Sequence, residues 1–213
     1  QTVYNAPMSS TSTMSDPRIA VLIPVYNEEM VLRGTIDALV AAGCERKHIY
    51  VVNDQSTDRT LEVARECGVN VHTVAENGGK ARAQVDAIKH FGLCESPFPY
   101  DWVIFLDGDT KVEPGFLGAM RTAAVENPTT ALFVGEVASV HNSHIFSALR
   151  AFDYTFGHDI AKRGQSNFNV VYVSPGCASM YRAEVLRDLH IDHMTLAEDM
   201  DLTIQVHRLG FKV

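Results

Sequence analysis

The sequence predicts an α/β fold in which a mostly parallel sheet is flanked by helices on both faces. Short apolar runs typical of buried strands alternate with segments whose apolar residues recur at helical spacing, and this alternation favours parallel strands joined by helices. The chain has 213 residues, 46% of them hydrophobic and 21% charged, which suits a globular domain with a sizeable core. No internal repeat or shift in composition divides it.

The alternation is clearest in the first half of the chain. The expected strands are residues 19–24, 48–53, 70–74 and 102–106, of which the last (WVIFL) is the most strand-like. The expected helices are residues 31–42, 58–67 and 79–90. Gly43 and Gly68 close the first two of these helices, where glycine is common because it adopts left-handed backbone. A further helix is expected to hold Pro114 in its first turn, where a missing N–H costs little.

The second half is less regular. The expected strands are residues 131–137 and 170–174, and the expected helices are residues 145–163, 182–189 and 197–209. Gly210 and residues 211–213 read as a helix stop and the start of another strand, so we expect the domain to be truncated at its C-terminus. Residues 1–17 lack periodicity and are expected to form a flexible N-terminal arm, which leaves residues 18–213 as a single domain.

Charge and cysteine usage exclude several classes of protein. Lys and Arg total 18 against 26 for Asp and Glu, and the net charge of −8 argues against binding to a nucleic-acid backbone. The scattered cysteines form no CxxC pair, so neither a zinc site nor a disulfide framework is indicated. No window reaches the ~18–20 apolar residues of a membrane span, and no signal peptide is evident, so we expect the fragment to be soluble.

Acidic and amide side chains follow the expected strands. In open α/β sheets, ligands bind outside the carboxyl ends of the strands, so these ends would line one rim. Carboxylates that converge there raise one another's pKa unless a cation compensates. The pattern therefore predicts a metal at the rim, which would also let an acidic protein bind an anionic ligand. The residues concerned are Asn27, Glu28, Asp54, Asp107 and Asp109.

Asp107-Gly108-Asp109 is the sharpest of these motifs. Two carboxylates separated by one small residue can offer hard oxygen ligands to Mg²⁺ or Mn²⁺, and Gly108 leaves room for a ligand. The metal would then neutralise a diphosphate. A tight turn with solvated aspartates is the alternative, because Asp and Gly are common in turns.

Residues 78–82 (GGKAR) open the helix expected at residues 79–90. Free backbone N–H groups, the positive helix end and Lys80 could meet a phosphate there, although a plain helix start is the alternative and the P-loop spacing is absent. Asp58 is expected to cap the helix at residues 58–67, which leaves Asp54 as the better candidate for a ligand contact.

Two later segments carry further candidates. Residues 174–178 (SPGCA) form a small-residue turn that either lets a substrate approach the backbone or is a simple loop. Glu198 and Asp199 lie at the start of the last helix, where the helix dipole favours acids and where a carboxylate could also act as a general base. The pairs His141/His144 and His190/His193 lack a third ligand in pattern and are expected to be surface histidines.

Taken in order, these motifs resemble family-2 glycosyltransferases of the GT-A fold, over residues 18–213. The motifs are PVYNEE, VVNDQSTDRT, ENGGKARA, FLDGDT, SPGCASMYR and AEDMDLTIQVHRLGF. The ordered set is most similar to that of the processive membrane synthases, the group containing cellulose, chitin, hyaluronan and poly-N-acetylglucosamine synthases.

The resemblance implies a role for each candidate residue. Asn27, Glu28 and Asp54 would flank the nucleobase and ribose of a nucleotide-sugar, with a UDP-sugar as the expected donor, and Lys80 would approach its diphosphate. Asp107 and Asp109 would hold Mg²⁺ or Mn²⁺, with Asp109 the stronger candidate. On the acceptor side the resemblance implies binding by Gly176, Cys177 and Glu198.

The resemblance also implies the reaction. Asp199 would deprotonate a hydroxyl of a growing saccharide, and a single displacement would invert an α-linked donor to a β-glycosidic bond. The implied setting is the cytoplasmic face of the plasma membrane, reached through segments absent from this chain. The sequence departs from the family pattern at Asn53 and Gln55 and at Ala197, and it lacks the Q-x-x-R-W motif of processive members.

Other functions are left open at this point. FLDGDT also fits the nucleophile loop of haloacid-dehalogenase-type phosphatases, but that loop follows the first core strand, and PVYNEE and NDQSTD would then have no role. A nicotinamide dehydrogenase is disfavoured because no GxGxxG follows the first strand. A non-catalytic nucleotide-sugar-binding fragment is the remaining alternative.

Overall fold

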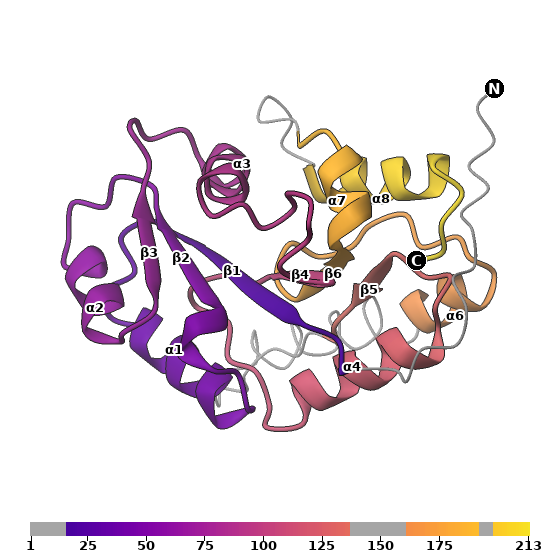
Figure 1. Cartoon of the computed structure of the whole chain (residues 1–213), viewed down its shortest axis with the longest axis horizontal. Coiled ribbons are helices and arrows are strands. Elements are labelled where there is room, and N and C mark those ends of the chain that lie inside the picture. The colour runs from indigo at the N-terminus through magenta and orange to yellow at the C-terminus, as the bar shows by residue number, and fades with distance from the viewer. Residues whose placement is uncertain (1–15, 137–160, 192–197) are drawn as a thin grey trace, which may run out of the picture.

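The computed structural model describes residues 16–136, 161–191 and 198–213 and contains the sheet that the sequence predicts (Figure 1). The sheet has the strand order β3-β2-β1-β4-β6-β5. β1 pairs in parallel with β2 and β4, and β2 pairs in parallel with β3, whereas β6 is antiparallel to both β4 and β5. The mostly parallel sheet is therefore confirmed. The strands are β1 (Ile19–Val25), β2 (Ile49–Asn53), β3 (Asn70–Thr73), β4 (Trp102–Phe105), β5 (Leu132–Val134) and β6 (Ser179–Arg182).

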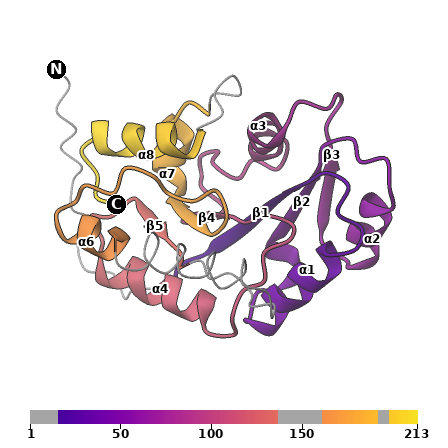
Figure 2. The same cartoon turned by 180° about the vertical axis from the view of Figure 1, so that it is seen from behind.

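A layer of helices covers each face of the sheet, as Figure 1 and the reverse view in Figure 2 show. One layer contains α1 (Leu32–Ala41), α2 (Thr60–Glu66) and α4 (Phe116–Glu126). The other contains α3 (Lys80–His90), α7 (Ala183–Asp188) and α8 (Glu198–Arg208). A short 3-10 helix (Arg46–His48) leads into β2, and α6 (Ala161–Asn167) precedes the segment that returns to β6.

The alternating side chains of β1 serve both layers. Val21 and Ile23 are fully buried in the core beneath α1, α2 and α4, whereas Ala20 and Leu22 are fully buried beneath α3, α7 and α8. This follows from the strand period of two, which sends successive side chains to opposite faces. β1 is thus apolar at every position and lies at the centre of the molecule. Its carboxyl end is held in place because both faces of the strand are packed against a core.

The strand expected at residues 170–174 is wrong. Val170 and Tyr172 are 54% and 59% exposed, so these apolar side chains have no sheet to pack against. The strand beside β4 is instead β6, in which Ser179 pairs with Phe105. The short β6 segment (SMYR) gives a weak strand pattern, because it is only four residues long.

Some smaller expectations also change. Pro114 lies before α4, which begins at Phe116, because a turn between Glu113 and Phe116 leads into the helix. The strand expected at residues 131–137 is shortened to β5. The chain end forms one parallel bridge, between Lys212 and Thr130.

Several expectations fall on residues that the structure does not describe. Residues 145–160 of the helix expected at 145–163 are among these. The described helix α6 covers Ala161–Asn167 and so ends four residues later than expected. His141, His144 and His193 also lie outside the described residues, and His190 is exposed as expected. None of the described helices is long and apolar enough to cross a membrane.

Candidate functional site

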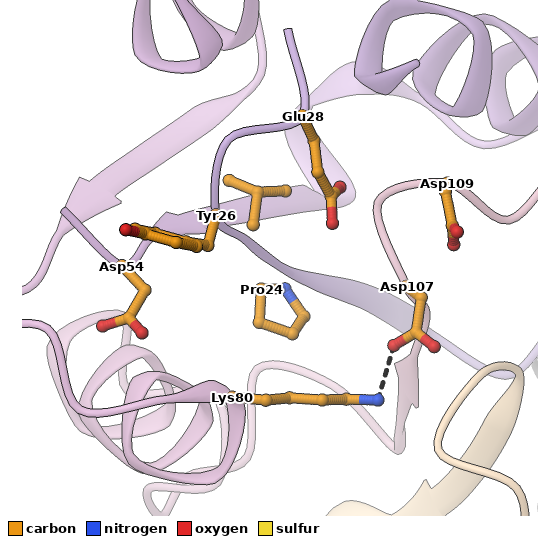
Figure 3. Close-up of a pocket in the computed structure, with 8 residues that line it drawn as sticks. Pro24, Tyr26, Glu28, Asp54, Lys80, Asp107 and Asp109 are labelled. Atoms are coloured by element: carbon orange, nitrogen blue, oxygen red, sulfur yellow. Dashed lines mark ion pairs between the residues drawn. The ribbon is translucent and has the colours of Figure 1, made fainter. Parts of the chain in front are cut away.

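A pocket of about 280 Å³ opens at the carboxyl ends of the central strands (Figure 3). Its lining comes from the ends of β1, β2 and β4 and from the first residue of α3. The strand ends thus meet at one rim, as the sequence predicts. The lining residues are Pro24, Val25, Tyr26, Glu28, Asp54, Lys80, Asp107 and Asp109.

Asp54 fixes the glycine loop that precedes α3. Its buried carboxylate accepts hydrogen bonds from the N–H groups of Gly78 and Gly79, at 3.0 and 2.8 Å, and its backbone carbonyl accepts one from the Asn77 amide, at 2.7 Å. The expectation that these glycine N–H groups are free for a phosphate is therefore wrong in this structure, because a carboxylate of the chain already holds them. The helix start at Lys80 is confirmed.

Lys80 points along the pocket toward Asp107 (Figure 3). Its Nζ lies 2.5 Å from Asp107 Oδ1. Burial opposes the charged form of Lys80, but the adjacent Asp107 carboxylate outweighs burial and raises the pKa of the ammonium. The lysine is therefore a firmly charged cation at the pocket, and its present partner is one of the carboxylates expected to bind metal.

Glu28 lies against the loop that carries Asp107 and Asp109 (Figure 3). A Cβ added to Gly108 would fall 1.7 Å from Glu28 Oε2, so the glycine makes the room that this carboxylate occupies. Oε2 is buried and has no hydrogen-bond partner among the described residues. Burial first, and then the charges of Asp109 and Asp107, raise the pKa of Glu28 to about 7.

Asn27 lies beside the pocket and is not among the residues that line it. Its side-chain oxygen accepts a hydrogen bond from the N–H of Thr57 at 2.8 Å, and its own N–H donates to Ser56 Oγ at 3.0 Å. It has a left-handed backbone, with φ of 56°. Asn27 therefore joins the loop after β1 to the loop after β2. The expectation that Asp58 is the N-cap of α2 is wrong, because the cap position is Arg59, but the Asp58 carboxylate still accepts the N–H of Thr60 at 2.9 Å.

The later candidates reach the same rim because β6 is reversed. Ser179, the first residue of β6, pairs with Phe105 at the end of β4, so the turn before β6 lies beside the start of the Asp107 loop. A Cβ added to Gly176 would lie 2.6 Å from Lys80 Nζ and 2.7 Å from Asp199 Oδ2. The structure thus brings Gly176, Lys80 and Asp199 together, although they are far apart in the sequence.

Asp199 is a half-buried carboxylate near the start of α8. Burial first, and then the neighbouring Glu198 carboxylate, raise its pKa, while the charge of Lys80 and a backbone hydrogen bond from Gly176 oppose the rise. Cys177 is a free, partly buried thiol, and burial followed by the charge of Asp107 raises its pKa. The turn residues and the acids of α8 therefore share one electrostatic environment with the pocket.

The pocket suits a divalent cation in its chemistry. The unpartnered oxygen of Glu28 and the carboxylates of Asp107 and Asp109 are hard ligands of the kind that Mg²⁺ and Mn²⁺ prefer. Among the described residues, however, no three His, Cys, Asp or Glu side chains are grouped closely enough to hold a metal by themselves. A bound ligand would therefore have to supply part of the coordination.

Lys162 is a residue that no sequence motif indicates. It lies in the polar helix α6, and its ammonium nitrogen is buried without a hydrogen-bond partner among the described residues. Burial lowers the pKa of Lys162 to about 8, and the charges of Cys177 and Asp199 oppose this. A lysine within the segment AKRGQSN matches no motif, so only the fold reveals its relation to Asp199.

Comparison with protein families and curated proteins gives consistent matches. The profile of the family described as "Glycosyl transferase family 2" matches residues 20–189. The poly-beta-1,6-N-acetyl-D-glucosamine synthase of Staphylococcus aureus is 25% identical over 200 residues, which cover 92% of this chain and 47% of that protein. The synthase of the same name from Staphylococcus epidermidis is 24% identical over the same coverage. The chain therefore spans about half the length of these relatives.

Solved structures share the fold. TarS 1-349 of S. aureus in complex with UDP-GlcNAc matches with a TM-score of 0.66 and 17% identity, covering 90% of this chain and 54% of that one. The mannosyltransferase PcManGT of Pyrobaculum calidifontis, in complex with GDP-Man and Mn2+, matches with a TM-score of 0.60 and 20% identity, covering 93% and 54%. The expected GT-A fold is confirmed by these neighbours. Together with the profile match over most of the sequence, they establish that the chain belongs to glycosyl transferase family 2.

Proposed function

We propose that this chain is the catalytic part of an inverting glycosyltransferase that moves a sugar from a UDP-sugar to a growing saccharide and forms a β-glycosidic bond. The observation that carries the proposal is the position of Gly176. Gly176 has no side chain, and both the Lys80 ammonium and the Asp199 carboxylate lie close to it. The Lys80 ammonium also contacts Asp107. A cation for a diphosphate, which lines the pocket, and a candidate base for a hydroxyl thus lie near each other, although Asp199 is not itself one of the lining residues.

On the donor side, Lys80 would exchange its ion pair with Asp107 for the diphosphate. Glu28 and Asp54 line the same pocket and would contact the nucleoside, with Asn27 fixing the adjoining loops. Asp107 and Asp109 would hold Mg²⁺ or Mn²⁺, which supplies charge neutralisation for the departing diphosphate. The complexes of TarS with UDP-GlcNAc and of PcManGT with GDP-Man and Mn2+ support a nucleotide-sugar donor and a divalent cation.

On the acceptor side, Asp199 would take the proton of an acceptor hydroxyl while that oxygen bonds to the anomeric carbon. The bond from this carbon to the diphosphate breaks on the opposite face, and its electron pair leaves with the nucleotide. Gly176, Cys177 and Glu198 surround Asp199 and would contact the acceptor. The raised pKa of Asp199 suits a base, because a carboxylate with a higher pKa accepts a proton more readily.

The names of the curated relatives support a polysaccharide as the product. Because the chain spans only part of these relatives, the activity of the whole protein, its acceptor, and a location at the cytoplasmic face of the plasma membrane remain predictions of the same proposal. The match to residues 20–189 includes FLDGDT, so the family explains this motif without the phosphatase alternative.

Thermal unfolding with nucleotide and metal tests the proposal. We expect UDP with Mn²⁺ to raise the Tm, since a ligand at about 100 times its Kd stabilises the native state by about 2.7 kcal/mol, and each kcal/mol moves the Tm of a chain of this size by about 2–4 °C. Asp109→Ala should abolish the shift, whereas Asp37→Ala on the exposed side of α1 should retain it. The absence of a metal-dependent shift with any nucleotide would contradict the proposal.

A further inference from the structure

Lys162 carries hydrogen-bonding capacity that the ligand-free protein does not use. An ammonium group has three donors, and a charged group that is buried without partners destabilises the fold. The nitrogen of Lys162 is buried and has no hydrogen-bond partner in the described part of the chain. A ligand that supplies the missing acceptors would remove this cost, so the groups near Lys162 indicate which ligand it binds.

Lys162 interacts electrostatically with two of the groups proposed to serve the acceptor. The titratable groups that interact with it are the Cys177 thiol, in the turn before β6, and the Asp199 carboxylate, near the start of α8. Lys80 faces Asp199 as well, but its ammonium is engaged by Asp107 at 2.5 Å. The two lysines are therefore not equivalent, because one has a carboxylate partner and the other has unsatisfied donors beside the proposed base.

We propose that Lys162 binds the saccharide acceptor, donating hydrogen bonds to sugar oxygens and so holding a hydroxyl group beside Asp199. This inference rests on the proposed function and adds to it a residue that contacts the acceptor. A sugar ring presents several hydroxyl and ring oxygens, and these are acceptors of the kind that the Lys162 ammonium lacks. The lysine would thus orient the acceptor, while Asp199 receives its proton.

The charges around Lys162 favour a neutral acceptor. Asp199, which interacts with Lys162, is adjacent to Glu198 at the start of α8. The other cation that acts on these two acids, Lys80, is already paired with Asp107. A saccharide that carries a carboxylate would be attracted by Lys162 but repelled by both acids. A neutral saccharide receives the hydrogen bonds of Lys162 without that repulsion.

The test compares Lys162→Met with Lys162→Arg and with Lys89→Met, a control at the exposed end of α3. The probes are a neutral β-linked N-acetylglucosamine oligosaccharide and the same oligosaccharide carrying a carboxylate. Binding to the chain saturated with UDP and Mn²⁺ is followed by saturation-transfer NMR, so that no turnover is needed. Tm and UDP affinity are measured on each variant.

We expect Lys162→Met to bind the neutral probe at least tenfold more weakly while its UDP affinity stays unchanged. Its Tm should be equal to or above that of the parent chain, since the variant removes a buried charge without partners. Lys162→Arg should retain part of the binding, and Lys89→Met should resemble the parent. The carboxylate probe should bind the parent chain more weakly than the neutral one.

Several results would overturn the inference. Unchanged binding of the neutral probe by Lys162→Met would do so, as would binding of neither probe by a parent chain that binds UDP. A lower Tm together with loss of UDP binding would assign Lys162 a structural role instead. Preference of the parent for the carboxylate probe would overturn the neutral acceptor. A parent chain that fails to bind UDP would count against the proposed function itself.

Discussion

The missing side chain of Gly176 leaves the space that Lys80 and Asp199 occupy. A Cβ at this position would lie 2.6 Å from Lys80 Nζ and 2.7 Å from Asp199 Oδ2, so one of these groups would have to move. Glycine is needed here for space, since the methyl group of an alanine would overlap both charged groups. The geometry of the proposed reaction therefore depends on residue 176 having no Cβ atom.

We predict that Gly176→Ala lowers sugar transfer about 100-fold, because a displacement of about 1 Å in a reacting group has effects of that order. The free energy of unfolding should change little, as the turn lies at the rim. Gly118→Ala is the matched control: no atom lies within 4 Å of the added Cβ, and the substitution in α4 should stabilise the chain by about 0.5–1 kcal/mol with full activity. Steady-state rates and urea unfolding measure both effects, and a fully active Gly176→Ala would contradict the prediction.

Glu28 makes the stability of the fold depend on pH. Its pKa is about 7 in the folded protein, against an ordinary value of 4.5, so the native state binds the proton more tightly than the unfolded state. The contribution of Glu28 therefore becomes less favourable as pH rises from about 4.5 to 7 and is constant above that range. We expect Glu28→Gln to raise the Tm more at pH 8 than at pH 5, measured with a chelator. An equal shift at both pH values would contradict this assignment.

At the scale of elements, the loop between β3 and α3 is held by a carboxylate of the chain itself. Asp54, at the end of β2, accepts the N–H groups of Gly78 and Gly79, and Asn77 donates to its carbonyl. These bonds fix the start of α3 and with it the position of Lys80. The loop resembles an anion-binding site in which the bound anion is the carboxylate of Asp54, which follows the neighbouring strand β2.

We predict that Asp54→Ala destabilises the chain by about 1–3 kcal/mol, since it leaves two backbone donors without their acceptors. UDP binding should also weaken, because Lys80 loses its fixed position. Asp37→Ala is the control, as its partner Arg46 lies 3.7 Å away at the surface and such pairs are worth about 0–1 kcal/mol. Urea unfolding gives the first quantity and calorimetric titration the second. An Asp54→Ala chain as stable as the control would contradict the role assigned to the loop.

The elements show why some parts of the fold are predictable from sequence. β1 and β4 are buried at every position, and the apolar runs that form them are unambiguous. β6 has a buried centre but only four residues, and it forms because β4 offers it an open edge. Residues 170–174 have the stronger apolar pattern, yet they pair with no strand of the sheet. Whether a short segment forms a strand therefore depends on pairing partners far away in the chain, which the local apolar pattern does not reveal.

At the scale of the whole molecule, the cores on the two faces share the central strands. β1 and β4 contribute side chains to both cores, so neither helix layer is complete without the same sheet. This is the physical basis for the prediction that residues 18–213 form a single domain. The two layers should lose their structure together rather than in turn.

A single unfolding transition is therefore expected. The only tryptophan of the sequence, Trp102, lies buried in β4 and reports on the centre of the sheet. Its fluorescence and the far-ultraviolet circular dichroism of the helices should give the same midpoint in urea. Two separated midpoints would show that the helix layers unfold independently and would contradict the single domain.

The candidate site was predictable in part. Each acid that follows a strand, such as Asp54 or Asp107, could be placed at the rim because parallel strands end on one side of a sheet. The meeting of Gly176, Lys80 and Asp199 follows from the direction of β6, which the sequence did not indicate. Lys162 lies in a helix without any motif, so its burial depends wholly on tertiary packing.

Because β6 is reversed, the site is built from opposite ends of neighbouring strands. β1, β2 and β4 deliver their ends to the nucleotide side, whereas β6 delivers its beginning, together with the turn that contains Gly176 and Cys177. The two contributions are coupled, because a Cβ on Gly176 would lie 2.6 Å from Lys80 Nζ at the start of α3 and 2.7 Å from Asp199 Oδ2. A substitution in the turn before β6 is therefore expected to act on α3 and α8 together.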